Sequence, residues 1–428
     1  MNKRLLLAEK AFTIISLIHY SGGPLVLILT GGASEGDGST GGSDFALIQL
    51  VFLVIYFINF CLLILRWKKV IQLVTKDISV WLLLGVAAFS FFWSYDPTIT
   101  KSRVIALFGT ILFSLYLASR YSLKEQLELL GWTFGIIIVT SFLLGIALPN
   151  YGKMEGVHWG KWRGIYSHKN VLGKVMTPSA IVFLLLAMKA QAKSWIFWGG
   201  LSSSVLLIIL SKSSSALLNI IILISALLLF QILKWRSDFM LTALLGILSI
   251  SIILYTLVTT NAATITALFG KDLTLSGRTN FWPLILDKIA QQPWLGYGFG
   301  AFWKGFDGPS DYIWHASSFK APNSHNGYLD LCLELGLVGL SIYLIGYFIS
   351  LQKALFYVRA VKTYDGFFPA LFLVYIVLAN LTESTLIIQN NFFLVIQFAI
   401  FFSISLPQKE PRKFTPEKYH KIKQIPII

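Results

Sequence analysis

The stretch NSHNGYLDLCLELGLVG, residues 323–339, places ionisable side chains at the start of a segment that is otherwise apolar enough to cross a membrane. Asp330 and Glu334 stand one helical turn apart and share a helix face with Asn326. A carboxylate at the middle of a membrane helix costs about 2.5–3.5 kcal/mol on insertion scales. We therefore expect this face to line a polar cavity. The alternative is that both acids pair with basic residues of a neighbouring helix.

A histidine in the preceding loop could do chemistry beside this face. His325 lies next to Asn326 and two residues after Asn323. The imidazole group, with a reference pKa near 6.5, can accept a proton from a hydroxyl nucleophile at neutral pH. Most isolated loop histidines have no such role, so a general base at His325 is a hypothesis that requires cationic partners nearby.

The composition shows which kind of protein carries these residues. Of the 428 residues, 56% are hydrophobic and only 13% are charged, which is too apolar for an ordinary soluble domain. A helix needs about 20 apolar residues to cross about 30 Å of hydrocarbon. The sequence predicts an all-α polytopic membrane protein, a single membrane domain over 1–428. Its twelve candidate spans centre near residues 20, 55, 86, 111, 137, 180, 203, 224, 249, 339, 374 and 397.

The distribution of basic residues predicts the orientation. With both termini in the cytoplasm, 22 of the 35 Lys and Arg residues fall on the cytoplasmic side, as the positive-inside rule requires. Ten of the other 13 gather in two outer segments, 153–174 and 271–320. Basic side chains kept on the outer face against the bias, beside His, Asn, Trp and Tyr, are typical of a site that holds a sugar phosphate. Arg163, Lys169 and Arg278 are the candidates.

The outer side carries two loops. The smaller spans 149–170, and the larger spans 260–326 between the ninth and tenth expected spans. In the larger loop, Phe281, Ile285 and Ile289 recur at helical spacing after a possible N-cap at Ser276, with Trp282 and Leu286 alongside. This pattern predicts an amphipathic helix on the membrane surface or on the bundle. Residues 407–428 form a basic tail suited to the inner leaflet.

Several other classes of site find no support. The sequence GDGSTG at 36–41 fits a dinucleotide-binding pattern, but it lies between membrane helices, so no cofactor is expected. There is no D-x-D pair to hold a metal, and no motif for nucleic-acid binding accompanies the basic residues. Cys61 and Cys332 lie in apolar runs, which predicts buried free thiols.

Four segments together resemble a known family. RGIYSHKNVLG (163–173), SGRTNFW (276–282), PWLGYGFGAF (293–302) and SHNGYLDLCLELGLVG (324–339) are similar to the signature segments of the O-antigen ligase and polymerase family, the Wzy/WaaL family of bacterial membrane glycosyltransferases. The form SHKNVLG is most similar to the exopolysaccharide polymerase branch. The resemblance extends from about residue 93 to 391.

The resemblance implies a twelve-helix inner-membrane enzyme of the GT-C type, with a large periplasmic loop. Such an enzyme transfers glycans from undecaprenyl diphosphate onto another glycan or onto lipid A core. By motif, His325 matches the family's base, and Arg163 and Arg278 match the arginines that hold the diphosphate. Lys169 and His168 match the branch pattern with less certain roles. Glu334 matches the family's acidic helix, while Asn326 and Asp330 are supporting residues.

The chemistry of these residues agrees with that function. The diphosphate leaves as a stable anion, so a single base on the acceptor hydroxyl suffices, and guanidinium groups can neutralise the developing charge without a metal. Attack from the opposite face would invert the anomeric centre. The alternatives are a protein O-oligosaccharyltransferase, a transporter of lipid-linked sugars and a noncatalytic membrane scaffold. Transporters commonly show two similar halves, which we do not see here.

Overall fold

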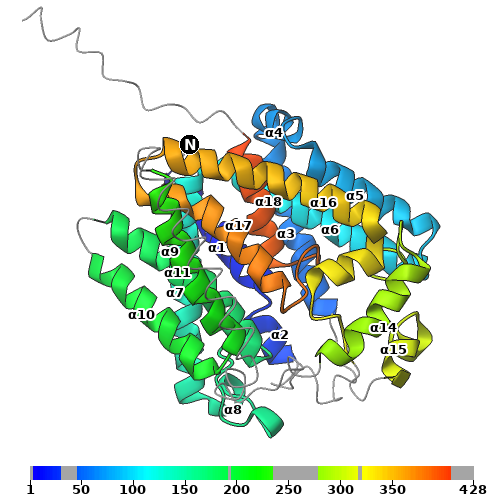
Figure 1. Ribbon diagram of the computed structural model, residues 1–428. Coiled ribbons are helices and arrows are strands. Elements are labelled where there is room, and N and C mark those ends of the chain that lie inside the picture. Colours follow the sequence, from blue (N-terminus) through cyan, green and yellow to red (C-terminus); the bar gives the residue numbers. More distant parts are fainter. Residues whose placement is uncertain (1–2, 30–45, 191–193, 235–277, 317–320, 406–428) are drawn as a thin grey trace, which may run out of the picture.

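The computed structural model describes residues 3–29, 46–190, 194–234, 278–316 and 321–405, apart from the side chains of 157 and 278–280. These residues form helices and contain no strand, which confirms the all-α expectation for this part of the chain. The helices (Figure 1) are α1 (Lys3–Tyr20), α2 (Pro24–Leu29), α3 (Ala46–Ile64), α4 (Trp67–Val74), α5 (Ile78–Phe89), α6 (Pro97–Arg120), α7 (Leu123–Ala147), α8 (Pro149–Gly152), α9 (Lys169–Lys189), α10 (Ser194–Ser211), α11 (Ser214–Ile232), α14 (Arg278–Gln291), α15 (Asp311–Ala316), α16 (Gly327–Ala360), α17 (Phe368–Asn380) and α18 (Phe392–Ile404).

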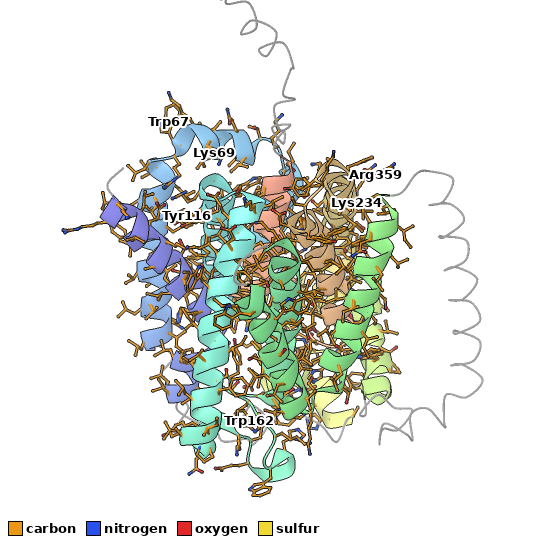
Figure 2. The ribbon with its side chains drawn as sticks, turned by 90° about the vertical axis from the view of Figure 1, so that its left-hand side faces the viewer. Trp67, Lys69, Tyr116, Trp162, Lys234 and Arg359 are labelled. Atoms are coloured by element: carbon orange, nitrogen blue, oxygen red, sulfur yellow. The ribbon has the colours of Figure 1, made fainter. Side chains whose placement is uncertain are left out.

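The bundle has two different ends. At one, which we call the terminal end, lie the start of α1 and the end of α18, together with Lys69, Lys234 and Arg359 (Figure 2). At the other, the loop end, lie Trp162 and the segments 149–168, 292–316, 321–326 and 381–391. All the residues singled out for chemistry belong to segments that meet or enter the loop end.

Seven of the described helices are long and apolar enough to cross a membrane, or eight if the bent pair α4 and α5 forms one span. They show that the chain is an integral membrane protein. Helices lie at eleven of the twelve expected positions, although several are short. The span expected near residue 249 and the basic tail 407–428 fall outside the described residues. The count of twelve, the topology and the loop boundaries stay predictions.

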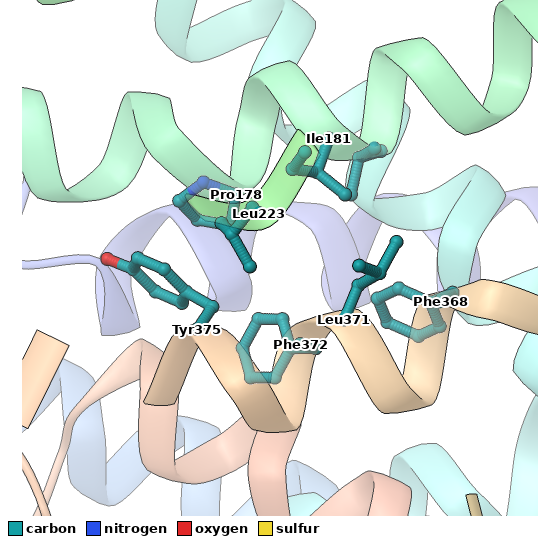
Figure 3. Close-up of a pocket in the computed structure, with 8 residues that line it drawn as sticks. Pro178, Ile181, Leu223, Phe368, Leu371, Phe372 and Tyr375 are labelled. Atoms are coloured by element: carbon teal, nitrogen blue, oxygen red, sulfur yellow. The ribbon is translucent and has the colours of Figure 1, made fainter. Parts of the chain in front are cut away.

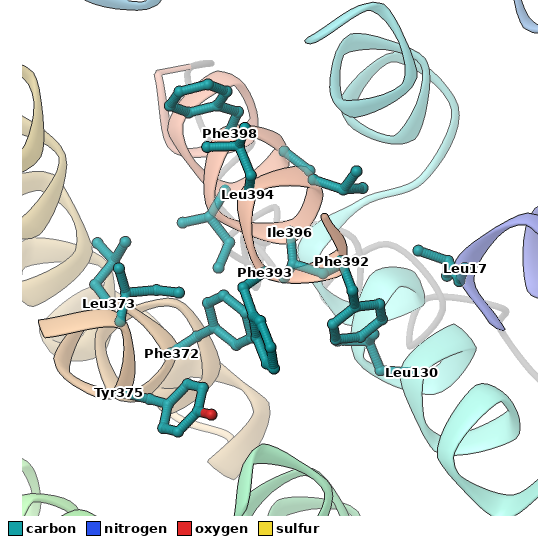
Figure 4. Packing of buried hydrophobic residues seen from close by; sticks show 14 of the residues in the cluster. Leu17, Leu130, Phe372, Leu373, Tyr375, Phe392, Phe393, Leu394, Ile396 and Phe398 are labelled. Atoms are coloured by element: carbon teal, nitrogen blue, oxygen red, sulfur yellow. The ribbon is translucent and has the colours of Figure 1, made fainter. Parts of the chain in front are cut away.

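The core is built around α18. All thirteen of its residues are buried, and its phenylalanines pack against α17 and α7 (Figure 4). A helix that is apolar on every side belongs in the interior. By contrast, α3 and α10 turn most of their side chains outward, which suits a lipid-facing position. Cys61 lies on that exposed surface of α3, so the expectation of a buried thiol is wrong there and holds for Cys332; both are free.

The longest helix, α16, is broken at Gly336, whose φ of +63° and ψ of −167° are not helical. An N–H just after such a break has lost its partner four residues earlier. The N–H of Leu337 donates instead to the carbonyl oxygen of Pro293 at 2.8 Å. That of Val338 donates to the carbonyl oxygen of Trp294 at 3.2 Å. A side chain at Gly336 would collide with Trp294, since a β-carbon there lies 2.2 Å from its backbone.

The carbonyl groups before the break are satisfied by the same piece of chain, residues 293–302, which we call the glycine-rich segment. The oxygen of Leu333 accepts from the N–H of Tyr297 at 2.8 Å. The oxygen of Glu334 accepts from the N–H of Gly298 at 3.0 Å. The two missing helical hydrogen bonds are thus replaced by four from the glycine-rich segment. Irregular backbone at membrane depth is tolerated where the protein supplies such partners.

Several charged residues at the terminal end form ion pairs. Glu9 of α1, 6% exposed, binds Arg66 at 2.6 Å and Arg120 at 3.1 Å. The ammonium group of Lys189, at the end of α9, lies 3.2 Å from Glu128 and 3.7 Å from Asp365. These contacts tie helices together at an end that carries none of the predicted site residues.

Candidate active site

The loop that carries His325 is held in an uncommon backbone conformation. His325 has φ +52°, in the left-handed region that few residues other than glycine adopt. Its N–H donates to the side-chain oxygen of Asn323 at 3.0 Å, and the side chain is half-buried. Such strain persists only where neighbouring groups fix the backbone, and it is commonly found at functional sites.

The residues on either side of His325 supply these fixing contacts. The hydroxyl of Ser324 donates to the carbonyl oxygen of Asn326 at 2.6 Å, which closes a tight turn around His325. The side chain of Asn326 accepts from the N–H groups of Tyr328 at 3.0 Å and Leu329 at 3.3 Å. Asn326 is therefore the N-cap of α16. The cap and the turn hold His325 at the mouth of the helix.

The carboxylate of Asp330 lies below this loop and accepts hydrogen bonds from it. Its side chain accepts from the N–H of Ser324 at 3.1 Å and from the indole N–H of Trp303 at 2.9 Å. The carbonyl oxygen of Ser324 in turn accepts from the indole of Trp282 at 3.0 Å. Among the described side chains, Asp330 thus binds the loop and no basic residue of another helix. It is placed to position His325.

Glu334 has a different neighbour. The guanidinium group of Arg103, on α6, lies close enough to interact electrostatically with its carboxylate. The stem of Arg103 passes over Gly300, where a β-carbon would lie 2.1 Å from the Arg103 Cδ atom. Gly300 also has φ +71°, so the position requires glycine twice over. Arg103 therefore offsets part of the cost of burying Glu334.

His168 is the N-cap of α9. Its Nδ1 accepts from the N–H of Asn170 at 3.1 Å, which places the proton of the neutral ring on Nε2. Burial lowers the pKa of His168 to about 4, and the charges of Lys169, His158 and His325 act in the same direction. The ring of His158 lies 5.5 Å away. His168 is therefore neutral at physiological pH.

The same electrostatic interactions bring in a residue that the sequence analysis missed. Glu383, in the segment between α17 and α18, opposes the lowering of the pKa of His168. The end of α17, just before this segment, packs on the start of α16, where a β-carbon at Gly327 would lie 2.2 Å from the side-chain oxygen of Asn380. His325 and Glu383 thus both lie within electrostatic reach of His168, from which they are 157 and 215 residues distant in the sequence.

Two of the predicted cations are turned toward the scaffold. Arg163 is only 2% exposed, and its guanidinium donates to the carbonyl oxygens of Tyr151 at 2.8 Å and Asn150 at 2.9 Å. Burial lowers the pKa of Arg163, and Glu155 opposes that change. The ammonium group of Lys169 donates to the side chain of Asn170 at 3.1 Å. Both residues stabilise the local structure at the loop end.

Arg278 is the first residue of α14, and its side chain lies outside the described part. Trp282 follows it by one helical turn, on the same face, and its indole binds Ser324 beside His325. The start of α14 is thus fastened to the loop of His325. The predicted amphipathic helix is present, with Phe281 and Ile285 buried, although Leu286 is exposed.

Of the residues predicted from sequence, the structure therefore groups His325, Asn326, Asp330 and His168, and places position 278 near them. Glu383, His158 and Arg103 were missed. The signal for Arg103 was present, because it is a charged residue in the second turn of an apolar helix on the basic outer side. Glu383 had no such signal, since it lies in an ordinary polar segment.

Comparison with known proteins bears on this arrangement. Residues 199–344, which include α14, the glycine-rich segment and His325, match the family model described as O-antigen ligase. The chain is also similar to the exopolysaccharide production protein ExoQ of Rhizobium meliloti (strain 1021), with 21% identity over 307 residues, which cover 68% of each chain. Both similarities support the O-antigen ligase and polymerase family, as the resemblance of the four sequence segments predicted.

Proposed function

We propose that the protein is a membrane glycosyltransferase that polymerises oligosaccharide repeats carried on undecaprenyl diphosphate, at the periplasmic face of the inner membrane. Both termini would then be cytoplasmic, and the loop end would be periplasmic. The observation that carries the proposal is the fixed loop of His325, held by Asp330 and Trp282 beside His168 and Glu383. An imidazole held rigidly among polar groups at the mouth of a membrane bundle suits a general base.

In the proposed reaction, the acceptor hydroxyl gives its proton to His325 while its oxygen attacks the anomeric carbon. The bond between that carbon and the diphosphate oxygen breaks, and the diphosphate leaves with the electron pair. Attack opposite the leaving group inverts the anomeric centre. Arg278 stabilises the charge that grows on the diphosphate, without a metal or other cofactor.

The remaining site residues act by position in this proposal. Asn326 and Asp330 hold the loop of His325, and His168 offers its Nε2 proton to the substrate. Arg163 and Lys169, which the family pattern associates with the diphosphate, shape the segments on which the lipid head group rests. Glu334 and Arg103 stabilise the part of α16 that lies below the loop of His325. The bilayer-facing flanks admit the polyprenyl tail.

Polymerisation is favoured over the alternatives by the relative whose printed name refers to exopolysaccharide production. The acceptor is then a second glycan rather than lipid A core or a protein. A strain that lacks the gene separates these possibilities. Single repeats left on the carrier would indicate a polymerase, whereas finished polymer stranded on the carrier would indicate a ligase.

The test of the site uses His325→Asn in that strain. Asparagine tolerates the left-handed backbone, so the loop is kept and only the base is lost. We expect polymer synthesis to fall by about a hundredfold or more, with the protein still inserted and folded. The control is His315→Asn, which changes an exposed histidine that pairs with Asp311 and should leave synthesis unchanged. Normal synthesis by His325→Asn would refute the proposed base.

A further inference from the structure

A large cavity opens between α7, α9 and α10, away from the loop end. Its volume is about 610 Å³, and most of its wall is apolar, with Gly131, Gly135, Phe183, Leu186 and Phe197 among the lining residues. Binding sites for small ligands typically have volumes of about 300–1,000 Å³. By contrast, the void between α9, α11 and α17 (Figure 3) holds only about 10 Å³, enough for one water at most.

The cavity is separate from the proposed active site. Lys189, at its mouth, and Lys169, near His168, are the two ends of α9. Twenty residues of helix place them about 30 Å apart. The cavity thus opens toward the other surface of the membrane, where its ligand would meet none of the residues of the active site.

The mouth carries an unusual set of charges. The ammonium group of Lys189 lies between two carboxylates, at 3.2 Å from Glu128 and 3.7 Å from Asp365. Asp365 is only 8% exposed, and its Oδ1 atom has no hydrogen-bond partner among the described residues. This oxygen is buried and Asp365 does not line the cavity, so the charged groups open to a ligand at the mouth are Lys189 and Glu128.

The depth of the mouth indicates the level of the membrane. Trp132 lines the cavity and is mostly exposed, and the ammonium group of Lys10 lies 5.6 Å from its ring centre. Tryptophan and lysine at the end of a span are typical of the head-group region. Lipid head groups therefore reach Lys189 and Glu128, while a chain directed inward meets the apolar wall.

We propose that this cavity binds one acyl chain of a phospholipid with a zwitterionic ethanolamine head group. The lipid phosphate rests on Lys189, and the ammonium group of the lipid donates to Glu128. Lys189 and Glu128 together complement a head group with one charge of each sign better than an anionic one. A lipid in this place braces α7, α9 and α10 where the protein itself leaves a gap.

The glycines of the wall allow a matched test. A β-carbon at Gly135 meets no atom within 4 Å, so Gly135→Leu fills the cavity without a clash. Gly85 of α5 is also helical, partly buried and open, and it does not line the cavity, so Gly85→Leu is the control. Ser203→Leu fills the cavity from α10 if Gly135→Leu does not fold.

The experiment uses the full chain, stripped of lipid in detergent and titrated with dioleoyl phosphatidylethanolamine or dioleoyl phosphatidylglycerol, with native mass spectrometry as the readout. We expect one phosphatidylethanolamine to be retained at least tenfold better than phosphatidylglycerol. Gly135→Leu should lose this binding and Gly85→Leu should keep it, while Glu128→Gln should lose the preference between head groups. Equal retention of the two lipids, tighter binding of undecaprenyl phosphate, or equal loss in both leucine variants would overturn the proposal.

Discussion

The two ends of the bundle use charged and polar residues in opposite ways. At the terminal end, Glu9 bridges Arg66 and Arg120 directly, between regular helices. At the loop end, Lys304 pairs with Asp96, but the loop of His325 is fixed by hydrogen bonds to Asp330 and Asn323. Every positive-φ residue in the described part lies at the loop end or at the break in α16.

This difference separates stability from chemistry. Charges that neutralise one another lock helices together but offer nothing to a substrate. A strained loop held by hydrogen bonds to its backbone leaves the imidazole of His325 to act on a ligand. Substitutions at the terminal end should therefore change the stability of the fold, and those around His325 should change turnover.

The largest effect is expected at the break in α16. It tests whether the loop end depends on the backbone hydrogen bonds between α16 and the glycine-rich segment. Gly336→Ala adds a β-carbon 2.2 Å from the backbone of Trp294 at a φ that alanine avoids. We expect it to lower the free energy of unfolding by about 3 kcal/mol or more. Thermal unfolding in detergent measures the effect. Gly85→Ala, at an open helical position, should leave stability unchanged or slightly raised.

The next largest effect is expected at Glu9. In Glu9→Gln, two guanidinium groups face each other without a carboxylate, which should cost about 2–3 kcal/mol because the site is largely buried. The protein that remains folded should make polymer at the normal rate per molecule. Asp311→Asn removes an exposed pair and should have little effect on stability. A large loss of turnover in folded Glu9→Gln would contradict the division between the two ends.

The sequence identified much of this arrangement, but not all of it. His325, the acids of α16 and the helix α14 could be predicted because each depends on local pattern: turn residues, helical spacing and charge in an apolar run. The backbone hydrogen bonds between α16 and the glycine-rich segment could not be predicted, since they join residues about 40 positions apart and leave no periodic signal. The orientation of Arg163 could not be predicted either, because the sequence shows the residue type and not the carbonyl oxygens to which its guanidinium group donates.

A smaller change at the loop end should alter turnover more than stability. Asp330→Asn keeps the size of the side chain but places an amide against the N–H groups of Ser324 and Trp303. We expect kcat to fall about tenfold while KM changes little, because the base is displaced and not removed. Asp330→Glu should restore part of the rate. Equal losses of rate and of folded protein would reduce Asp330 to a structural residue.

His168 gives the smallest effect, seen as a dependence on pH. The pKa of His168 is about 4 in the folded protein and near 6.5 when unfolded, so between these values only the unfolded state binds the proton. Stability should therefore fall as pH drops through this window, by about 1–2 kcal/mol for a partly buried group. His168→Asn keeps an N-cap acceptor and should flatten the slope. Unfolding midpoints measured from pH 7 to 4 test this, and parallel curves for the two proteins would exclude it.

The hydrogen bonding of the glycine-rich segment to α16 also bears on membrane insertion during synthesis. The ribosome releases residues 293–298 before residues 333–338, so the segment that completes the broken helix is already present when that helix emerges. If the order were reversed, the broken part of α16 at Gly336 would enter the bilayer with backbone N–H and C=O groups that have no hydrogen-bond partner. Synthesis from N- to C-terminus thus supplies the partner first, and a circular permutation that opened the chain between the two segments should impair insertion.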